Sequence, residues 1–446
     1  MLPITKMLDI NVKIQAASLS RLAFGVPLIF DTENVLNASP TEGIVRSFTS
    51  LSDMVDAGYQ PYNAAYKQAK IMLAQQPHPA VFKVGCSGAD GSATLDYIVA
   101  VDSEWFLLLV SDYADTTNTA AADWCLTQNG EKFYVAGLAA ATAVATAETL
   151  LGTSNPMVSP WYIDTATQVR TIKINKPFDD AANVTITVNG VATAATTWDT
   201  DNATTLAAFA TAIEALDSVA TAVSDGVDTI TVTSNATLND LVFSAFTNSG
   251  DPTQKAAYAT VSEAASPIDA ALVGIVAPKT PGSLDACWKA LIGCQSQTIS
   301  SSLSAELDAV NCNYYTSIGG RVLTYRGVCS AMVADGVPLF ADLVWGKAGL
   351  QADLTATLAD ALTAQDKLPY NDSGIGAVVG CIGNVGKRWV SKGFLEPFNS
   401  KTAITYPKGN EIPPSERSSR VLNGITAQFV ATGSIQKVGL NVTIQA

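Results

Sequence analysis

The last six residues of the chain, Asn441-Val442-Thr443-Ile444-Gln445-Ala446, nearly repeat Asn11-Val12-Lys13-Ile14-Gln15-Ala16 near its start. In both places apolar residues alternate with polar ones, which is the period-two pattern of a half-buried β-strand. Chain ends usually fray unless something holds them, so each of these strands needs a sheet edge to pair with. The apolar members of the two patterns are Leu8, Ile10, Val12 and Ile14 near the start and Val438, Leu440, Val442 and Ile444 near the end.

Two interpretations of these terminal strands are open. They can be edge strands of the chain's own sheet, which predicts a monomer. They can also be donated to other copies of the same chain by strand addition, which predicts a lattice. In the second case the eight apolar residues belong to arms that link subunits.

The composition favours a protein whose surface faces other protein. With 446 residues the chain is long enough for two or three domains with substantial cores. Charged residues make up 15%, against roughly 25% in an ordinary soluble domain, and the formal net charge is −14. This acidic balance argues against direct binding of nucleic acid, which needs a basic footprint.

The charge is unevenly distributed along the chain. From Lys387 to the end there are eight basic and three acidic residues, so this segment carries +5 and the remainder −19. The basic group includes Lys387, Arg388 and Lys392. Such a segment can meet an acidic partner or the chain's own acidic remainder, or it can be an ordinary solvated surface.

The cysteines and the chain start bear on the compartment. Seven cysteines are scattered without a C-x-x-C pair, which is typical of reduced, buried thiols in a protein made in a reducing cytoplasm. The first residues lack the apolar core of a signal peptide. No apolar run approaches the roughly 18 residues of a membrane span, so we expect no membrane insertion.

Alternating strands and helices in the first 165 residues indicate an α/β layer. We expect one helix capped by Ser50 or Ser52, a second opened by Pro61 and a third over 120–129. The segment 105–110 is apolar throughout, which predicts a central strand. The expected strands are 24–30, 44–48, 80–85, 96–101, 105–110 and 132–136.

The composition changes near residue 166. Residues 171–262 are rich in Thr, Ala and Asp, and Asn189-Gly190 between alternating residues is a strong hairpin signal. We expect strands at 172–174, 184–188 and 229–234 and a helix over 204–216. The α/β pattern resumes at Pro267, so residues 166–265 are predicted to form a β-rich domain inserted into a larger one.

In the remaining chain the sequence predicts two strands, then two helices, then further β-structure. We expect strands near 321–325 and 339–344, a helix from Leu350, a second helix from about Ile375, and β-structure at 425–430 and 435–444. The apolar face of the second helix is made of Val378, Val379, Ile382, Val385 and Trp389.

No catalytic, metal or cofactor site is predicted, and we expect no enzyme activity. The single histidine, His78, lies between two prolines, where neither a metal-binding histidine pair nor a Ser-His-Asp arrangement is expected. The glycines of 374–380 lack the spacing of a phosphate-binding loop and suit a close-packed helix better. Asp199 and Asp201 resemble the start of a calcium loop whose remainder is missing. A carboxylate pair for sugar hydrolysis stays open, because any two of the 40 acidic residues could meet.

Several short segments, in order, resemble the contractile tail sheath proteins of myovirus-type bacteriophages. Residues 166–265 lie outside this resemblance, and the closing block is a degenerate form of the family pattern. The carrying segments are Val45-Arg46-Ser47-Phe48, Gln75-Gln76-Pro77-His78-Pro79, Ala122-Asp123-Trp124, Phe133-Tyr134-Val135, Pro281-Gly282-Ser283, Asn313-Tyr314-Tyr315, the run from Lys367 to Ile375, Arg417 with Arg420, and the run from Ala431 to Val438.

The resemblance implies a multidomain α/β (α+β) structural protein that polymerises as stacked rings around a tail tube. Its terminal arms would complete sheets in neighbouring subunits, and its contraction would drive the tube into the host. The implied partners are further copies of the chain, the tail tube protein, and the baseplate and tail terminator proteins. The implied location is the virion, after assembly in the bacterial host cytoplasm. Lys387, Arg388 and Lys392 are then predicted to face the tube.

The expected layout is an N-terminal arm at 1–20, a discontinuous sheath domain at 21–165 and 266–317, the insert at 166–265, and a C-terminal polymerisation domain at 318–446. Two other function classes stay open. One is a different virion protein, such as a tail tube or a decoration protein with a glycan-binding insert. The other is a tail-associated hydrolase.

Overall fold

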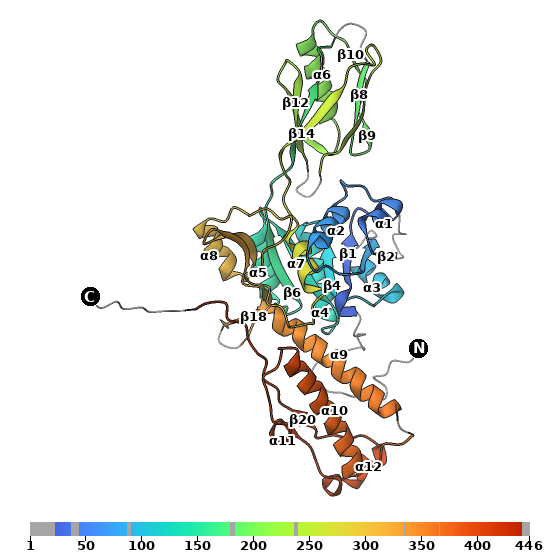
Figure 1. Ribbon diagram of the computed structural model, residues 1–446, viewed down its shortest axis with the longest axis vertical. Coiled ribbons are helices and arrows are strands. Elements are labelled where there is room, and N and C mark those ends of the chain that lie inside the picture. Colours follow the sequence, from blue (N-terminus) through green and yellow to red (C-terminus); the bar gives the residue numbers. More distant parts are fainter. Residues whose placement is uncertain are drawn as a thin grey trace, which may run out of the picture.

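The computed structural model describes residues 23–36, 44–86, 91–178, 183–235, 240–333, 336–364 and 366–438. Three bodies follow one another along its long axis (Figure 1). A β-rich body lies at one end, an α/β body in the middle and a helical body at the other end. This mixed α/β multidomain architecture confirms the fold class expected from the sequence.

The middle body is built on a six-stranded sheet with the strand order β2-β3-β1-β4-β5-β6. All neighbours are parallel except the edge strand β2, which runs antiparallel to β3. The apolar strand β4 lies inside the sheet between β1 and β5, as predicted. The strands are β1 (Pro27–Asp31), β2 (Val45–Phe48), β3 (Phe82–Cys86), β4 (Leu107–Val110), β5 (Phe133–Ala139) and β6 (Val158–Ile163).

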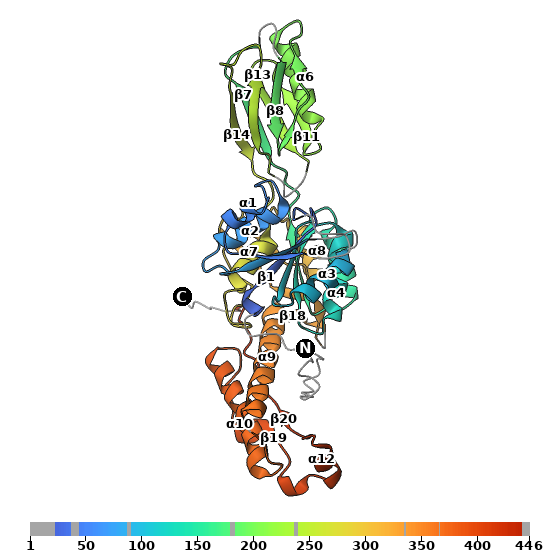
Figure 2. The same ribbon diagram turned by 90° about the vertical axis from the view of Figure 1, so that its right-hand side faces the viewer.

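Helices cover both faces of this sheet (Figure 2). One face carries α1 (Leu51–Asp56), α2 (Ala64–Ala74) and α7 (Ile268–Val276), and the other carries α3 (Gly91–Val101) and α4 (Asp115–Thr127). Helix α5 (Ala143–Gly152) contacts α4, β5 and β6. Ser50 caps α1, as expected, because its side chain accepts a hydrogen bond from the Asp53 N–H while Asp53 bonds back to the Ser50 N–H. A short 3-10 turn, η2 (Ala23–Gly25), precedes β1, and α8 (Ser301–Ala309) lies beyond α5.

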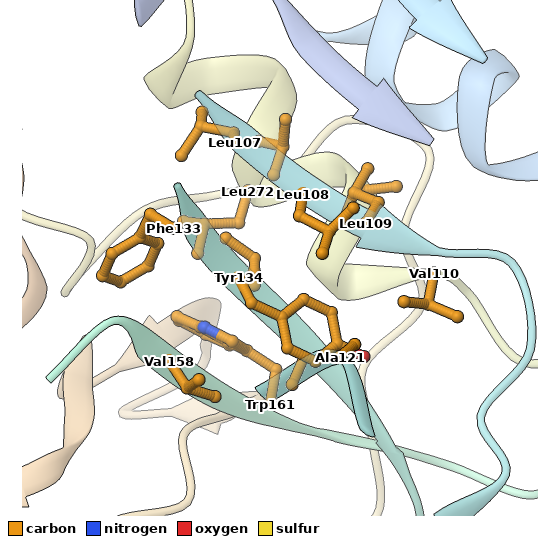
Figure 3. Close-up of a cluster of buried hydrophobic side chains, with 14 of the residues drawn as sticks. Leu107, Leu108, Leu109, Val110, Ala121, Phe133, Tyr134, Val158, Trp161 and Leu272 are labelled. Atoms are coloured by element: carbon orange, nitrogen blue, oxygen red, sulfur yellow. The ribbon is translucent and has the colours of Figure 1, made fainter. Parts of the chain in front are cut away.

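The core of the middle body is continuous with the start of the helical body. Buried side chains from β4, β5, β6 and α7 interlock between the layers (Figure 3). Ring contacts then run from Phe106 through Phe133 to Trp345, with centroid separations of 6.4 and 5.2 Å. The same core includes Ala352, which lies beyond residue 317. The domain boundaries drawn from the sequence stay predictions.

The strand expected at 96–101 is wrong, because this segment forms helix α3. Leu95 and Ile98 are both buried, at a spacing of three that a helix satisfies and a strand does not. The Asp96 carboxylate accepts a hydrogen bond of 2.7 Å from Trp124 Nε1, which joins α3 to α4. The apolar run 97–101 is short enough to fit a strand or a helix when read alone, and its packing against α4 goes with the helix.

The β-rich body consists of two four-stranded sheets and helix α6 (Asn202–Glu214) around a core of its own. Asn189 and Gly190 both adopt positive φ, at 49° and 82°, in the turn that joins β8 to β9, as the hairpin signal predicted. The strands are β7 (Val169–Ile174), β8 (Asn183–Val188), β9 (Val191–Ala192), β10 (Thr196–Thr197), β11 (Val219–Ser224), β12 (Thr229–Ser234), β13 (Phe243–Asn248) and β14 (Ala256–Ser262).

Polar contacts join this body to the middle one. The Ala265 N–H donates to the Ala166 carbonyl at 2.8 Å, so the entering and leaving chain segments lie side by side. Lys67 on α2 forms a largely buried ion pair of 2.9 Å with Asp240. The two bodies are therefore linked by more than the connecting chain.

The chain returns to the sheet through two hairpins before the helical body begins. Asn313 ties them to β6, since its side chain accepts from the N–H groups of Gly327 and Val328 and donates to the Pro160 carbonyl. The hairpins are β15 (Tyr314–Ile318) with β16 (Arg321–Tyr325), and β17 (Val328–Met332) with β18 (Pro338–Phe340).

The strand expected at 339–344 is largely wrong, because β18 ends at Phe340 and α9 (Ala341–Thr363) begins at once. The helix expected from Leu350 therefore starts nine residues earlier. The early start lets Trp345 pack edge-on against Phe133 in the sheet. Of the β-structure expected at the end of the chain, the described residues contain the two-residue strand β20 (Thr426–Ala427), while residues 432–438 form no ladder.

Candidate assembly interface

The helical body is organised by the antiparallel pair of α9 and α10 (Asp372–Ser391). Asn371 caps α10 with its side-chain oxygen, which accepts the Gly374 N–H at 3.0 Å. The buried face of α10 includes Ile382, Val385 and Trp389, which agrees with the face predicted from the 3.6-residue period.

A buried carboxylate gathers two of the three basic side chains predicted to face a tube. The Asp353 side chain on α9 is 6% exposed and accepts hydrogen bonds from Trp389 Nε1 at 2.8 Å and from Arg388 Nε at 3.0 Å. The ammonium group of Lys392 lies 4.0 Å from the same carboxylate and over the Trp389 ring. Lys387 is exposed on the same helix. Two of the three charges therefore serve contacts inside the subunit, and their contact with a tube stays a prediction.

Past α10 the chain forms a short two-stranded ribbon of β19 (Ile404–Thr405) and β20. Ile404 is buried against α9 and α10, and it pairs with Ala427. Neither outer edge of the ribbon has a further strand partner among the described residues. A two-stranded ribbon of this size is marginal alone, and its free edges can accept another strand. The segment around it includes α11 (Ser400–Ala403), η4 (Gly409–Glu411) and α12 (Pro414–Ser419).

The chain then passes back over the subunit in residues 430–436, which we name the arm root. Leu395 and Ala431 form an isolated antiparallel bridge, and the Thr432 N–H donates to the Phe394 carbonyl at 2.9 Å. At the end of the root, Gln436 Nε2 donates to Asp285 Oδ1 at 3.0 Å and to the Arg326 carbonyl at 2.8 Å. The arm root is thus fixed to its own subunit.

Apolar side chains of this segment are exposed. The exposed fractions are 62% for Val430, 83% for Ile435 and 78% for Val438. We name residues 437–446, which follow the arm root in the chain, the C-terminal arm. Of the eight predicted arm residues, Val438 is described; Leu440, Val442, Ile444 and the N-terminal set Leu8, Ile10, Val12 and Ile14 lie outside the described residues.

Two carboxylates lie beneath the arm root. Burial, with a smaller effect of the charge on Asp285, raises the pKa of Asp342 to about 6, while a hydrogen bond from Ser434 of the arm root lowers it. Sequence analysis missed Asp285, Asp342 and Asp353. No local pattern marks them, because the partners of Asp353 and Asp285 described above lie 35 to 151 residues away along the chain.

The place where an open α/β sheet usually binds ligands is occupied by the protein itself. The strand order reverses between β1 and β4, which predicts a crevice at their carboxyl ends. There the buried Asp31 accepts hydrogen bonds from Tyr59 and two backbone N–H groups. Glu33 accepts the Ala64 N–H at the start of α2, which would otherwise be open to an anion. The described residues at this crevice therefore leave no open anion site at the start of α2.

An apolar cavity of about 380 Å³ opens between α4 and α9. Among the described residues that line it, Lys347 is the one titratable group, and a single ammonium group does not make an acid–base pair. The described residues contain no cluster of His, Cys, Asp and Glu able to hold a metal ion. Among the same residues, no helix is both long and apolar enough to cross a membrane.

Comparison with solved structures places this fold among sheath proteins. The sheath complex of an extracellular contractile injection system, PVC, in its contracted state has a TM-score of 0.57 and 11% identity, covering 96% of this chain and 93% of that one. The chain has a sheath-type fold. The sheath tail proteins of Desulfitobacterium hafniense and Listeria innocua give TM-scores of 0.47 and 0.37, each at 8% identity, and the matches cover 90% and 88% of this chain and 93% and 89% of theirs. No family model and no curated protein sequence matches the chain.

Proposed function

We propose that this chain is the subunit of a contractile sheath, which polymerises helically by exchanging terminal strands. The observation that supports it most directly is the C-terminal segment. Its root is held by hydrogen bonds to the subunit, while Ile435 and Val438 expose large apolar side chains. Such exposure suits a segment that a neighbouring copy covers.

The ribbon of β19 and β20 is the acceptor that we propose for the arms. A donated strand would add ladder hydrogen bonds at about 1 kcal/mol net each and bury apolar side chains at about 1.5–3 kcal/mol each. Ordering the arm costs about 1–2 kcal/mol per residue, so each link gains a few kcal/mol at most. Many such links make a mesh whose subunits can move relative to one another without separating.

We further propose that this sheath belongs to a phage tail. There it would surround a tail tube, end at baseplate and tail terminator proteins, and contract to drive the tube into a host. It would form part of the virion and assemble in the host cytoplasm. The exposed Lys387 and the basic C-terminal segment support an acidic inner partner. The protein would act mechanically and not as an enzyme.

The test is removal of the C-terminal arm, residues 437–446, which leaves the arm root and its contacts intact. We expect unchanged thermal unfolding and loss of tubes in negative-stain microscopy and sedimentation. A parallel deletion of residues 1–16 should also leave a folded protein that cannot polymerise. Tubes of normal width from either truncated protein would contradict exchange through that arm.

A further inference from the structure

The end of the arm root lies in a binding site formed by residues far away in the chain. The side-chain amide of Gln436 donates to both oxygens of Asp285, at 3.0 and 3.1 Å, and to the Arg326 carbonyl at 2.8 Å. From the other side Trp288 Nε1 donates to the Gln436 carbonyl at 3.0 Å. The side-chain donor and the backbone acceptor of Gln436 are therefore both bonded to the subunit.

This site is held in shape independently of the arm. Asp285 also accepts the Cys287 N–H at 3.0 Å, and the Trp288 N–H donates to the Thr324 carbonyl at 2.9 Å. The Thr324 hydroxyl donates to the Ala286 carbonyl at 2.6 Å. Gly327 has φ +80°, and a Cβ there would lie 2.7 Å from that of Ala286, so the neighbouring loops meet at close range.

The arm root presents alternate residues to the subunit. Thr432, Ser434 and Gln436 contact it through Gly393, Asp342 and Asp285 respectively. Ile435 between them is 83% exposed. From Thr432 to Gln436, the even-numbered residues therefore contact the subunit. The apolar residues of the arm continue this parity at 438, 440, 442 and 444.

We propose that the site formed by Asp285, Trp288 and the Arg326 carbonyl fixes the register of the exchanged C-terminal strand. This inference rests on the proposed sheath function and adds a specific element to it. With Gln436 held, the ten residues of the arm reach at most about 33–36 Å. Their even-numbered apolar side chains arrive on one defined face, and a shift of one residue would turn that face away from the acceptor.

The experiment inserts serine residues after Lys437. One serine reverses the parity of the arm, whereas two serines restore it and lengthen the arm slightly more. We expect the single insertion to lower the yield of sedimentable tubes about ten-fold or more, and the double insertion to lower it less than about three-fold. The double insertion is the matched control for added length.

The same insertions in a Gln436→Ala background test the role of the site. A released arm can slide into register, so one and two serines should then give equal yields. Trp288→Phe, which removes only the indole N–H donor, is the second variant and should reduce the difference between the insertions. Hydrogen exchange on the unassembled protein should show faster exchange of the 431–437 amides in Gln436→Ala than in the wild type.

The outcomes separate the two proposals. If the wild type forms no tubes, the proposed function fails. If the wild type forms tubes and one or two serines give the same yield, the register role fails while the sheath function stands. If parity matters equally with and without Gln436, the acceptor alone sets the register and the inference is overturned.

Discussion

Trp389 Nε1 donates a 2.8 Å hydrogen bond to Oδ2 of Asp353, and this bond joins the two long helices of the helical body. Trp389 is 1% exposed and Asp353 is 5% exposed, so water has little access to either group. Arg388 and Lys392 surround the carboxylate on its outer side. The charge of Asp353 is thus compensated, and the helices are held at one relative rotation.

Replacing Asp353 by Ala should destabilise the helical body. The indole N–H of Trp389 would lose its acceptor in a buried place, which costs about 1–3 kcal/mol. Urea unfolding followed by tryptophan fluorescence measures the effect. Lys387→Ala is the control, because this exposed residue on the same helix should change stability by less than about 0.5 kcal/mol. Equal stability of the two variants would show that the buried bond contributes nothing.

Alanine substitutions at two glycines in these helices should change the stability of the protein in opposite directions. A methyl group at Gly346 on α9 would overlap the ring of Phe394, whereas at Gly376 on α10 it would meet no atom within 4 Å. Gly346→Ala should therefore cost about 1–3 kcal/mol through overpacking. Gly376→Ala should stabilise by about 0.5–1 kcal/mol, since glycine is a poor helix former. Thermal unfolding of both variants checks the pair, and a stabilising Gly346→Ala would mean that Phe394 can move aside.

Asp269 should make stability depend on pH. Burial raises its pKa from the ordinary 3.8 to about 7, although Tyr113 donates a hydrogen bond to it at 2.8 Å. Between about pH 4 and 7 the folded state binds more protons than the unfolded state, so this group's contribution to stability falls as pH rises. Above pH 7 the loss is complete.

Asp269→Asn should remove this dependence, because an amide does not ionise. The side-chain oxygen of the introduced Asn can still accept the hydrogen bond from Tyr113. Its amide group, suitably rotated, can also donate to Oε1 of the neighbouring Gln68, which is buried and has no partner among the described residues. Urea unfolding at several pH values should show that the free energy of unfolding of the variant rises relative to that of the wild type from pH 4 to 7. Above pH 7 the difference between the two proteins should stay constant. Parallel curves for the two proteins would contradict the role of Asp269.

Features that depend on residues close together in the chain could be predicted from the sequence. The Ser50 cap, the Asn189-Gly190 turn and the apolar face of α10 each follow from a few consecutive positions. The prediction was wrong at α3, because a short apolar run such as 97–101 does not by itself distinguish a strand from a helix. It could not find the Gln436 site, because Asp285 and Gln436 are 151 residues apart and neither belongs to a motif.

The inserted body should be removable, and this is the sharpest test of the predicted insertion at 166–265. Ala166 and Ala265 already lie side by side, joined by a 2.8 Å backbone hydrogen bond. Replacing residues 167–264 by a short Gly-Ser linker should therefore leave the middle body folded, with a stability change of about 1 kcal/mol from the lost Lys67–Asp240 pair.

Deleting residues 169–234 instead is the control. It removes β7 and β8, the partners of β14 and β13, and should cause aggregation by exposing half of a core. Circular dichroism and gel filtration distinguish the two, and misfolding of the linker variant would mean that the insert is part of one folding unit with the sheet.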